Sequence, residues 1–158
     1  PDYYTRGVAR DLNTSPDILR IILQKGILQR GSDSISEYAA KNPSCPPDAL
    51  KEVLQRGKDD WISRFAARNP SCPPDALREV LRRGKSDQVS QYAVENPNCS
   101  PDTLREVLQR GKNDQVSWHA AETPNTPPDI LREVLQRGND NWVSCNETSI
   151  IIFFCIFF

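Results

Sequence analysis

Histidine, cysteine and acidic side chains are the groups of this sequence that could carry chemistry. His119 is the only histidine among the 158 residues, and an imidazole can act as a general base or bind a metal. It holds the position that Tyr38, Phe65 and Tyr92 hold in other copies of an internal repeat. We therefore expect a packed ring there rather than a base or a metal ligand, for which the sequence offers no partner.

Charged residues recur with the same period. Because short acidic side chains commonly cap helices, the recurring aspartates are expected to be loop and cap residues: Asp59, Asp60, Asp87 and Asp114. Arg-Glu pairs are expected to form a solvated, mutually neutralising face, since exposed ion pairs contribute only about 0–1 kcal/mol; they are Arg78-Glu79, Arg105-Glu106 and Arg132-Glu133. The sequence has no phosphate-binding loop, nucleophile motif or metal motif. It therefore predicts no enzymatic activity and no cofactor.

The cysteines do not form a disulfide or zinc pattern. Cys45, Cys72 and Cys99 share one repeat position, which Thr14 and Thr126 hold in other copies. Equivalent residues of stacked helices lie about 8–10 Å apart, whereas a disulfide needs Cα atoms within about 7 Å. No Cys/His cluster has zinc spacing. We expect small buried thiols, which favours a reducing compartment such as the cytoplasm and leaves a secreted or cell-surface location open.

These residues are placed by a repeat of fixed length. Asn42, Asn69 and Asn96 open copies of one phrase 27 residues apart, and Thr123 opens a fourth. Self-similarity at such a period is typical of a solenoid, in which each unit buries its apolar face only against its neighbours.

The longer helix of each unit is marked at both ends. Pro73 is expected at the first helical position, and the carboxylate of Asp75 meets the positive end of the helix dipole. Thr126 with Asp129 is the better capping box, because a hydroxyl accepts hydrogen bonds better than a thiol. Gly84 is expected to end the helix in the left-handed conformation. An apolar stripe lies between these ends in four copies: Leu50, Val53, Leu54; Leu77, Val80, Leu81; Leu104, Val107, Leu108; and Leu131, Val134, Leu135.

A shorter helix, α or partly 3₁₀, is predicted between Gly84 and Asn96. Asp87 can cap it, and it ends before Pro97, because the residue before a proline is pushed out of the helical region. Two helices per unit predict an all-α superhelix over residues 1–145. Four extra residues near 24–31 predict a bulge there or an extension of the longer helix of that unit.

Residues 146–158 depart from the repeat and form an apolar C-terminal tail. The run from Ile150 to Phe158 is too short to span a bilayer, which needs about 20 residues. Three roles stay open for it: a tail folded over the last unit, a truncated membrane segment, or a sticky end that drives association. Asn146-Glu147-Thr148 is a glycosylation acceptor if the chain is secreted.

The run Arg-x-x-Ala-x-Asn-Pro-x-Cys-Pro-Pro-Asp-x-Leu-x-x-x-Leu, at Arg64 to Leu81, resembles the leucine-rich repeat variant family. The resemblance covers Thr5 to about Ser144. It implies a right-handed superhelix of alternating α and 3₁₀ helices without strands. The unit here is a few residues longer than the usual unit of that family, so its longer helix is expected to be fully α. One member carries a cysteine-ligated iron–sulfur cluster ahead of its repeats, but no such spacing occurs here and no cofactor is implied.

Two positions of the shorter helix change freely from copy to copy. One holds Glu37, Arg64, Gln91 and Trp118, and the other holds Ser34, Trp61, Gln88, Gln115 and Trp142. A position that accepts both Trp and Gln is not packed in a tight core, so it is either simply solvated or part of a binding face, where Trp is often an anchor. The candidate binding surface is Trp61, Arg64, Gln88, Gln91, Gln115, Trp118 and Trp142.

The charge balance bears on the class of partner. The 20 Lys and Arg residues nearly cancel the 21 Asp and Glu residues, for a net charge of -1, whereas a nucleic-acid binder is expected to be basic. We therefore expect a non-enzymatic scaffold that binds a protein or peptide. End-to-end assembly of copies into a fibre is one alternative, and nucleic-acid binding is a less favoured one. Membrane contact is expected only through residues 150–158.

Overall fold

The computed structural model describes residues 2–28 and 34–137. Several predictions lie outside this part of the chain. They are the boundary between the 1–145 solenoid and the 146–158 tail, the apolar run 150–158, the acceptor Asn146, the candidate residue Trp142, and the end of the 24–31 insertion beyond Leu28.

The described residues form ten α-helices and no strand. The helices are α1 (Asp2–Arg10), α2 (Pro16–Leu28), α3 (Ser34–Lys41), α4 (Pro47–Gln55), α5 (Trp61–Arg68), α6 (Pro74–Arg82), α7 (Gln88–Glu95), α8 (Pro101–Gln109), α9 (Gln115–Glu122) and α10 (Pro128–Gln136). The prediction of an all-α fold is confirmed. Both helices of each described unit are α, so the shorter one is not 3₁₀.

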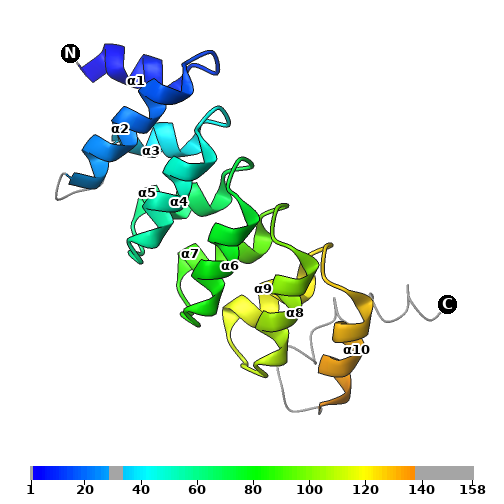
Figure 1. Cartoon of the computed structure of the whole chain (residues 1–158). Coiled ribbons are helices and arrows are strands. Elements are labelled where there is room, and N and C mark those ends of the chain that lie inside the picture. The colour runs from blue at the N-terminus through cyan, green and yellow to red at the C-terminus, as the bar shows by residue number, and fades with distance from the viewer. Residues whose placement is uncertain (1, 29–33, 138–158) are drawn as a thin grey trace.

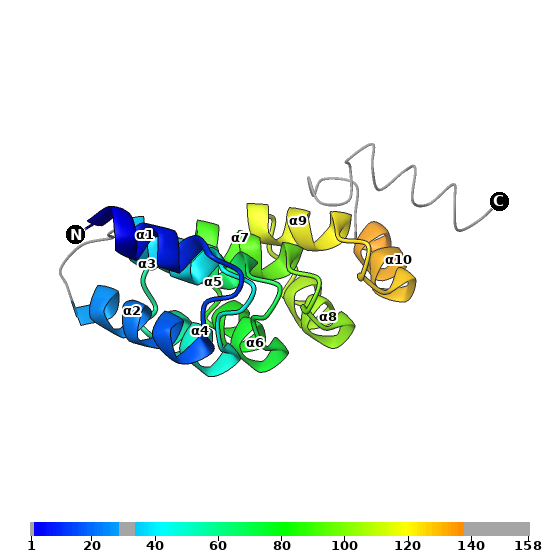
Figure 2. The ribbon, with the colours of Figure 1, turned by 90° about the horizontal axis from the view of Figure 1, so that it is seen from above.

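The helices are arranged in two layers. Each odd-numbered helix packs against the next odd-numbered one, and each even-numbered helix against the next even-numbered one. Within a unit, an even-numbered helix packs against the odd-numbered helix that follows it. Figure 2 shows the two layers on opposite sides, and Figure 1 shows them advancing along the molecule in chain order. The chain is an all-α repeat solenoid.

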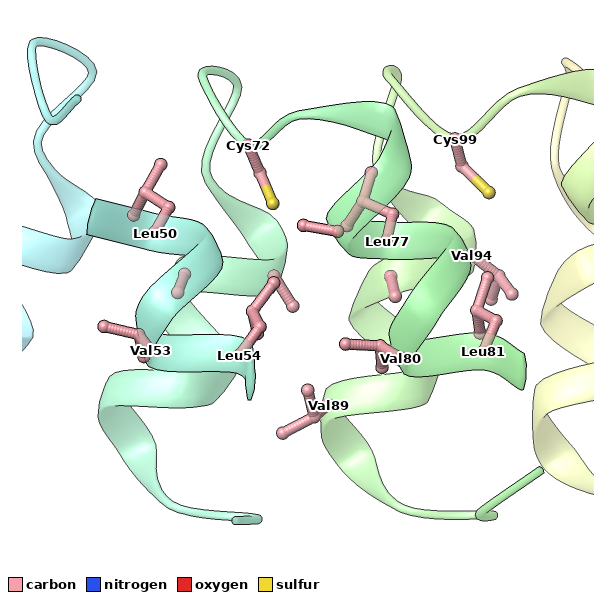
Figure 3. Packing of buried hydrophobic residues seen from close by; sticks show 14 of the residues in the cluster. Leu50, Val53, Leu54, Cys72, Leu77, Val80, Leu81, Val89, Val94 and Cys99 are labelled. Atoms are coloured by element: carbon pink, nitrogen blue, oxygen red, sulfur yellow. The ribbon is translucent and has the colours of Figure 1, made fainter. Parts of the chain in front are cut away.

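The predicted apolar stripes form the core between the layers. On α6, Leu77, Val80 and Leu81 are exposed by 3% or less, as are their equivalents on α4 and α8. Figure 3 shows these side chains between neighbouring helices, with Cys72 and Val94 in the same layer of apolar contacts. Full burial of a leucine contributes about 1.5–3 kcal/mol relative to exposure. Burial of the repeated stripe therefore stabilises the packing of each unit against its neighbours.

The even-numbered helices begin one residue later than the sequence predicts. Pro73 is the N-cap of α6, with φ -75° and ψ 145°, and Pro74 is the first helical residue. The cause is the Pro-Pro pair: the first proline precedes another proline and is forced into extended backbone, while the second has the φ that a helix needs. In α8, Ser100 replaces the first proline, and its hydroxyl accepts a hydrogen bond from the backbone N–H of Thr103 at 3.2 Å.

The predicted capping box of Thr126 and Asp129 is wrong. Pro127 is the N-cap of α10, and no side chain caps that helix. Because the Pro-Pro pair moves the cap one residue along, Thr126 is left outside the helix. Its hydroxyl turns back and donates to the carbonyl of Ala120 on α9.

Glycine ends three even-numbered helices as predicted. Gly57, Gly84 and Gly111 have φ values of 65°, 66° and 64°, in the left-handed region that favours glycine. Gly26 stands at the equivalent place in α2 but lies inside the helix, which runs 13 residues to Leu28 instead of nine. The extra residues therefore lengthen the helix through Leu28.

Candidate binding surface

The variable positions lie on one face of the odd-numbered helices. Trp61, Arg64, Phe65 and Arg68 are spaced i, i+3, i+4 and i+7 on α5, and this spacing places them on one face. None of the four is buried, whereas Ile62, Ser63, Ala66 and Ala67 on the other face are. We call this face the outer stripe. Its other members are Tyr3, Arg6, Gly7, Arg10; Ser34, Glu37, Tyr38, Lys41; Gln88, Gln91, Tyr92, Glu95; and Gln115, Trp118, His119, Glu122.

The N-termini of these helices are fixed by the predicted aspartates. The carboxylates of Asp60, Asp87 and Asp114 accept hydrogen bonds from backbone N–H groups three residues along, at 2.8–2.9 Å. These three are N-caps, as predicted. Asp59 instead accepts two hydrogen bonds from the guanidinium group of Arg64, at 2.8 and 3.1 Å, and these bonds lower the pKa of the Asp59 carboxyl.

The predicted candidate residues lie on this stripe wherever they are described. Trp61 is 50% exposed, and the guanidinium of Arg64 lies 4.9 Å from the centre of its ring. The side-chain amide of Gln91 on α7 donates to that of Gln115 on α9 at 2.7 Å. Trp118 is half-buried beside His119, with 4.7 Å between the ring centres. Gln88 is exposed.

A row of cations on aromatic rings crosses this stripe, and these cations were not among the predicted site residues. Each cation at the C-terminal end of one odd-numbered helix lies over a ring of the next. The pairs are Arg10 over Tyr38 (4.6 Å to the ring centre), Lys41 over Phe65 (3.9 Å) and Arg68 over Tyr92 (5.6 Å). The attraction of a cation to a ring face orients both groups. The signal in the sequence is the cation at position i+7 of the stripe in the first three copies.

The row changes chemistry between α7 and α9. Glu95 holds the place of the cation and His119 holds the place of the ring, with 2.9 Å between the Glu95 carboxylate and Nδ1 of His119. His119 is half-buried, as expected for a packed ring. The last stripe position of each helix is therefore a cation on α1, α3 and α5 and a glutamate on α7 and α9.

Two of the cavities lined by described residues adjoin the stripe. One of about 280 Å³ is lined by Lys41, Phe65, Arg68, Asn69 and Pro70 at the C-terminal ends of α3 and α5. The other, of about 400 Å³, lies at the N-terminal end of the solenoid and is lined by Tyr3, Tyr4, Gly7, Val8 and Asp11.

The stripe rests on a ladder of buried asparagines, whose contacts were not predicted either. The side-chain N–H group of Asn69 donates to the carbonyls of Ala40 and Asn42 in the preceding unit, at 2.6 and 2.9 Å. Its side-chain oxygen accepts the N–H of Ser71 at 2.8 Å. Asn42 and Asn96 make the same contacts. Each rung thus joins two units by main-chain carbonyls.

The ladder ends in different residues. Asp11 stands at the first rung and accepts the N–H of Asn13, but a carboxylate has no N–H group to donate. Thr123 stands at the last rung, and its hydroxyl lies 3.3 Å from the carbonyl of Val94.

Ion pairs join the even-numbered helices, across units rather than within the Arg-Glu pairs that the sequence suggests. Arg78 and Arg82 of α6 both pair with Glu106 of α8, and Arg105 pairs with Asp129 of α10 at 2.6 Å. The hydrogen bonds from Arg78 and Arg82 lower the pKa of Glu106 to about 2. These arginines pair with the next unit because the next even-numbered helix places a carboxylate within reach of each of them.

Replacing Glu106 with Gln should make stability less sensitive to acid. A carboxyl with a lowered pKa in the folded state stabilises it at pH values above the unfolded pKa, and this contribution is lost as the pH falls toward the folded pKa. For Glu106 the window runs from 4.5 to about 2. Urea unfolding at pH 6 and pH 3 should show a smaller loss for Glu106→Gln than for the wild type. Glu52→Gln, at an exposed site on α4, is the control, and an equal loss in all three proteins would contradict the prediction.

The three described cysteines are unpaired and buried. Burial raises the pKa of the Cys45, Cys72 and Cys99 thiols to about 12. Since the thiolate is the reactive form, these thiols are poor nucleophiles and metal ligands. Thr14, at the same position, donates to the carbonyl of Val8 at 2.5 Å, so the row is a packing row.

Alkylation of these cysteines should be slow until the protein unfolds. From the raised pKa, we expect iodoacetamide at pH 8 to modify Cys45, Cys72 and Cys99 about a thousandfold more slowly in the native protein than in urea. Peptide mapping by mass spectrometry separates them from Cys145 and Cys155. Rapid native-state labelling of any of the three would contradict their burial.

The described residues show neither a metal-binding cluster nor a membrane-spanning helix. They contain no cluster of three or more His, Cys, Asp or Glu residues arranged to hold a metal ion. None of their helices has the length and apolar character needed to cross a bilayer.

Comparison of the chain with protein-family models, curated proteins and solved structures gives no match.

Proposed function

We propose that this protein is a non-enzymatic scaffold whose outer stripe binds a protein or peptide partner. The observation that carries the proposal is the contrast between the two faces of the odd-numbered helices. Their inner face repeats almost unchanged, as in Ser63, Ser90 and Ser117. The outer stripe changes from Trp and Arg on α5 to Gln on α7 and Gln and Trp on α9. Solenoids commonly use such extended surfaces for binding.

Trp61 is the best anchor of this surface. It is a large apolar side chain left half exposed, stacked on Phe65 with 5.8 Å between ring centres and covered on one side by Arg64. Trp and Arg are enriched among residues that dominate binding energy. A rigid ring beside a fixed guanidinium group loses little freedom when a partner binds.

Selection from a displayed random-peptide library, followed by titration of the selected peptides, tests the proposal. Trp61→Ala should weaken their binding by about 2 kcal/mol, the usual size for an anchor residue. Tyr4→Ala is the control, because Tyr4 is 88% exposed and lies outside the outer stripe. Failure to select any peptide, or equal loss in the two variants, would contradict the proposal.

We also propose that the chain is a divergent relative of the leucine-rich repeat variant family. The run from Arg64 to Leu81 supports this, as does its folding into a short helix, a proline turn and a longer helix. The α form of the short helices differs from the family's expected 3₁₀ helices.

End-to-end assembly is a second candidate, favoured by the apolar N-terminal end. Six large hydrophobic side chains are exposed on α1, α2 and the turn between them: Tyr3, Tyr4, Leu12, Ile18, Ile21 and Leu28. In a head-to-tail stack, Asp11 would place a carboxylate against the carbonyls of another copy. Sedimentation over a concentration series should therefore show stronger association for Asp11→Asn and weaker association for an Ile18→Ser, Ile21→Ser variant. A strictly monomeric Asp11→Asn protein would exclude this mode.

A further inference from the structure

The three outer-stripe cations at the C-terminal ends of α1, α3 and α5 have no carboxylate partner among the described residues, unlike many cations of the even-numbered helices. Arg20, Lys51, Arg78 and Arg105 each pair with an acidic residue of the next unit. Among the described residues, no carboxylate forms an ion pair with Arg10, Lys41 or Arg68, whose cationic groups lie over aromatic rings. All three are exposed. We call these three residues the cation row.

The cation row is held in place before any partner binds. Lys41 lies 3.9 Å from the centre of the Phe65 ring, and both residues, with Arg68, line the 280 Å³ cavity beside Pro70. A cation held on a ring keeps its charge available on the solvent side. Phe65 and Pro70 thus form an apolar surface of the cavity between the charges of Lys41 and Arg68. Such a cavity fits an acidic side chain, which joins a carboxylate to a short aliphatic segment.

The distance between adjacent cations of the row determines the spacing of acidic side chains that a partner peptide needs. The three residues stand on α1, α3 and α5, which pack in sequence, and packed helices lie about 8–10 Å apart. A peptide in the polyproline II conformation rises about 3.1 Å per residue and completes one turn in three residues. Acidic side chains three residues apart therefore lie on one face of such a peptide, about 9 Å apart, and match adjacent cations of the row.

We propose that the cation row of Arg10, Lys41 and Arg68 binds an extended acidic peptide with a carboxylate at every third residue. The proposal rests on the scaffold function proposed above and specifies the partner for one part of its surface. Glu95 ends the row, because its carboxylate would repel the next acidic residue of the peptide. The acidic segment is thus confined to α1, α3 and α5.

Fluorescence anisotropy with a labelled peptide carrying glutamate at every third position tests this. Lys41→Gln with Arg68→Gln should weaken binding about tenfold, as expected for two ion pairs at a partly exposed site. Lys25→Gln with Lys58→Gln removes the same charge from exposed residues off the stripe and should change affinity less than twofold. Circular dichroism checks that both variants fold. Equal loss in the two pairs would overturn the proposal, since it would indicate general attraction only.

A variant that extends the row gives a second readout. Glu95→Arg with His119→Tyr restores the cation and ring of the other units at α7 and α9, and it should tighten binding of a peptide one acidic residue longer. Tighter binding of oligothymidine than of the acidic peptide would overturn the proposal in favour of a nucleic acid. If library peptides bind and the acidic peptide does not, this inference fails and the scaffold function stands. If no peptide of either kind binds, both fail.

Discussion

Asn69→Ala is expected to lower the free energy of unfolding by about 3–5 kcal/mol. Asn69 is 2% exposed. Its side-chain N–H group donates to the carbonyls of Ala40 and Asn42, and its side-chain oxygen accepts the N–H of Ser71. Water cannot readily replace these contacts at a buried site. Each buried polar group left without a partner costs about 1–3 kcal/mol, and here the loss falls on the joint between two units.

Urea unfolding with hydrogen exchange of α3 and α5 measures this effect. Asn98→Ala is the matched control, because the Asn98 side chain also donates to two carbonyls of the preceding unit, at 2.6 and 2.9 Å. Asn98 is only half-buried, so water can replace its side chain and the cost should be about 1 kcal/mol or less. A similar cost for both variants would show that burial of the rung does not matter.

Gly26→Ala is expected to destabilise the first unit by about 3 kcal/mol, at the upper end of overpacking costs. Gly26 is buried inside α2, and a Cβ there would overlap Oγ and Cβ of Ser36 on α3. The overlap involves the first atoms of the Ser36 side chain, which cannot turn away. The two helices would have to move apart at the place where α2 is longer than its equivalents.

Gly7→Ala provides a control with the opposite sign. A Cβ at Gly7 meets nothing within 4 Å, and an exposed helical glycine replaced by alanine should stabilise by about 0.5–1 kcal/mol. Thermal unfolding compares the two variants. Ser36→Gly in the Gly26→Ala background should recover part of the loss, and no recovery would show that the cost arises elsewhere.

Much of the fold is predictable because its signals are local and repeated. The i, i+3, i+4 stripes predicted the helices and their buried faces, as at Leu77, Val80 and Leu81. Gly84 was predicted to end α6 in the left-handed region, and it does. The prediction failed where two local rules compete: Pro73 was predicted as the first helical residue, but the restriction on residues before proline makes it the N-cap, and Pro74 begins the helix.

Contacts between units could not be read from the repeat alone. Asn69 before Pro70 was interpreted as the end of a helix, which is correct but omits its hydrogen bonds to Ala40 and Asn42. A period shows that a residue recurs and does not show which atoms of the neighbouring unit it reaches. The Arg105 contact with Asp129, in place of a pairing with its chain neighbour Glu106, has the same cause.

The candidate surface was predictable in part. Comparison of the copies identified Trp61, Arg64 and Gln91, because their positions vary, and the structure places them on the outer stripe. The same comparison does not find Arg10, Lys41 and Arg68 by variability, since three of the copies keep a cation. Only the three-dimensional stacking shows that these cations lie over rings of the next helix.

The asparagine ladder also bears on how such a gene could change length. The side chain of each asparagine in the ladder donates to two carbonyls of the unit before it. In Asn42 and Asn69, the main-chain carbonyl in turn accepts from the asparagine 27 residues further along the chain. Duplication or deletion of one whole internal unit would leave every amide facing an acceptor of the same kind. Recombination between tandem copies could therefore lengthen or shorten the molecule in single steps without compensating substitutions.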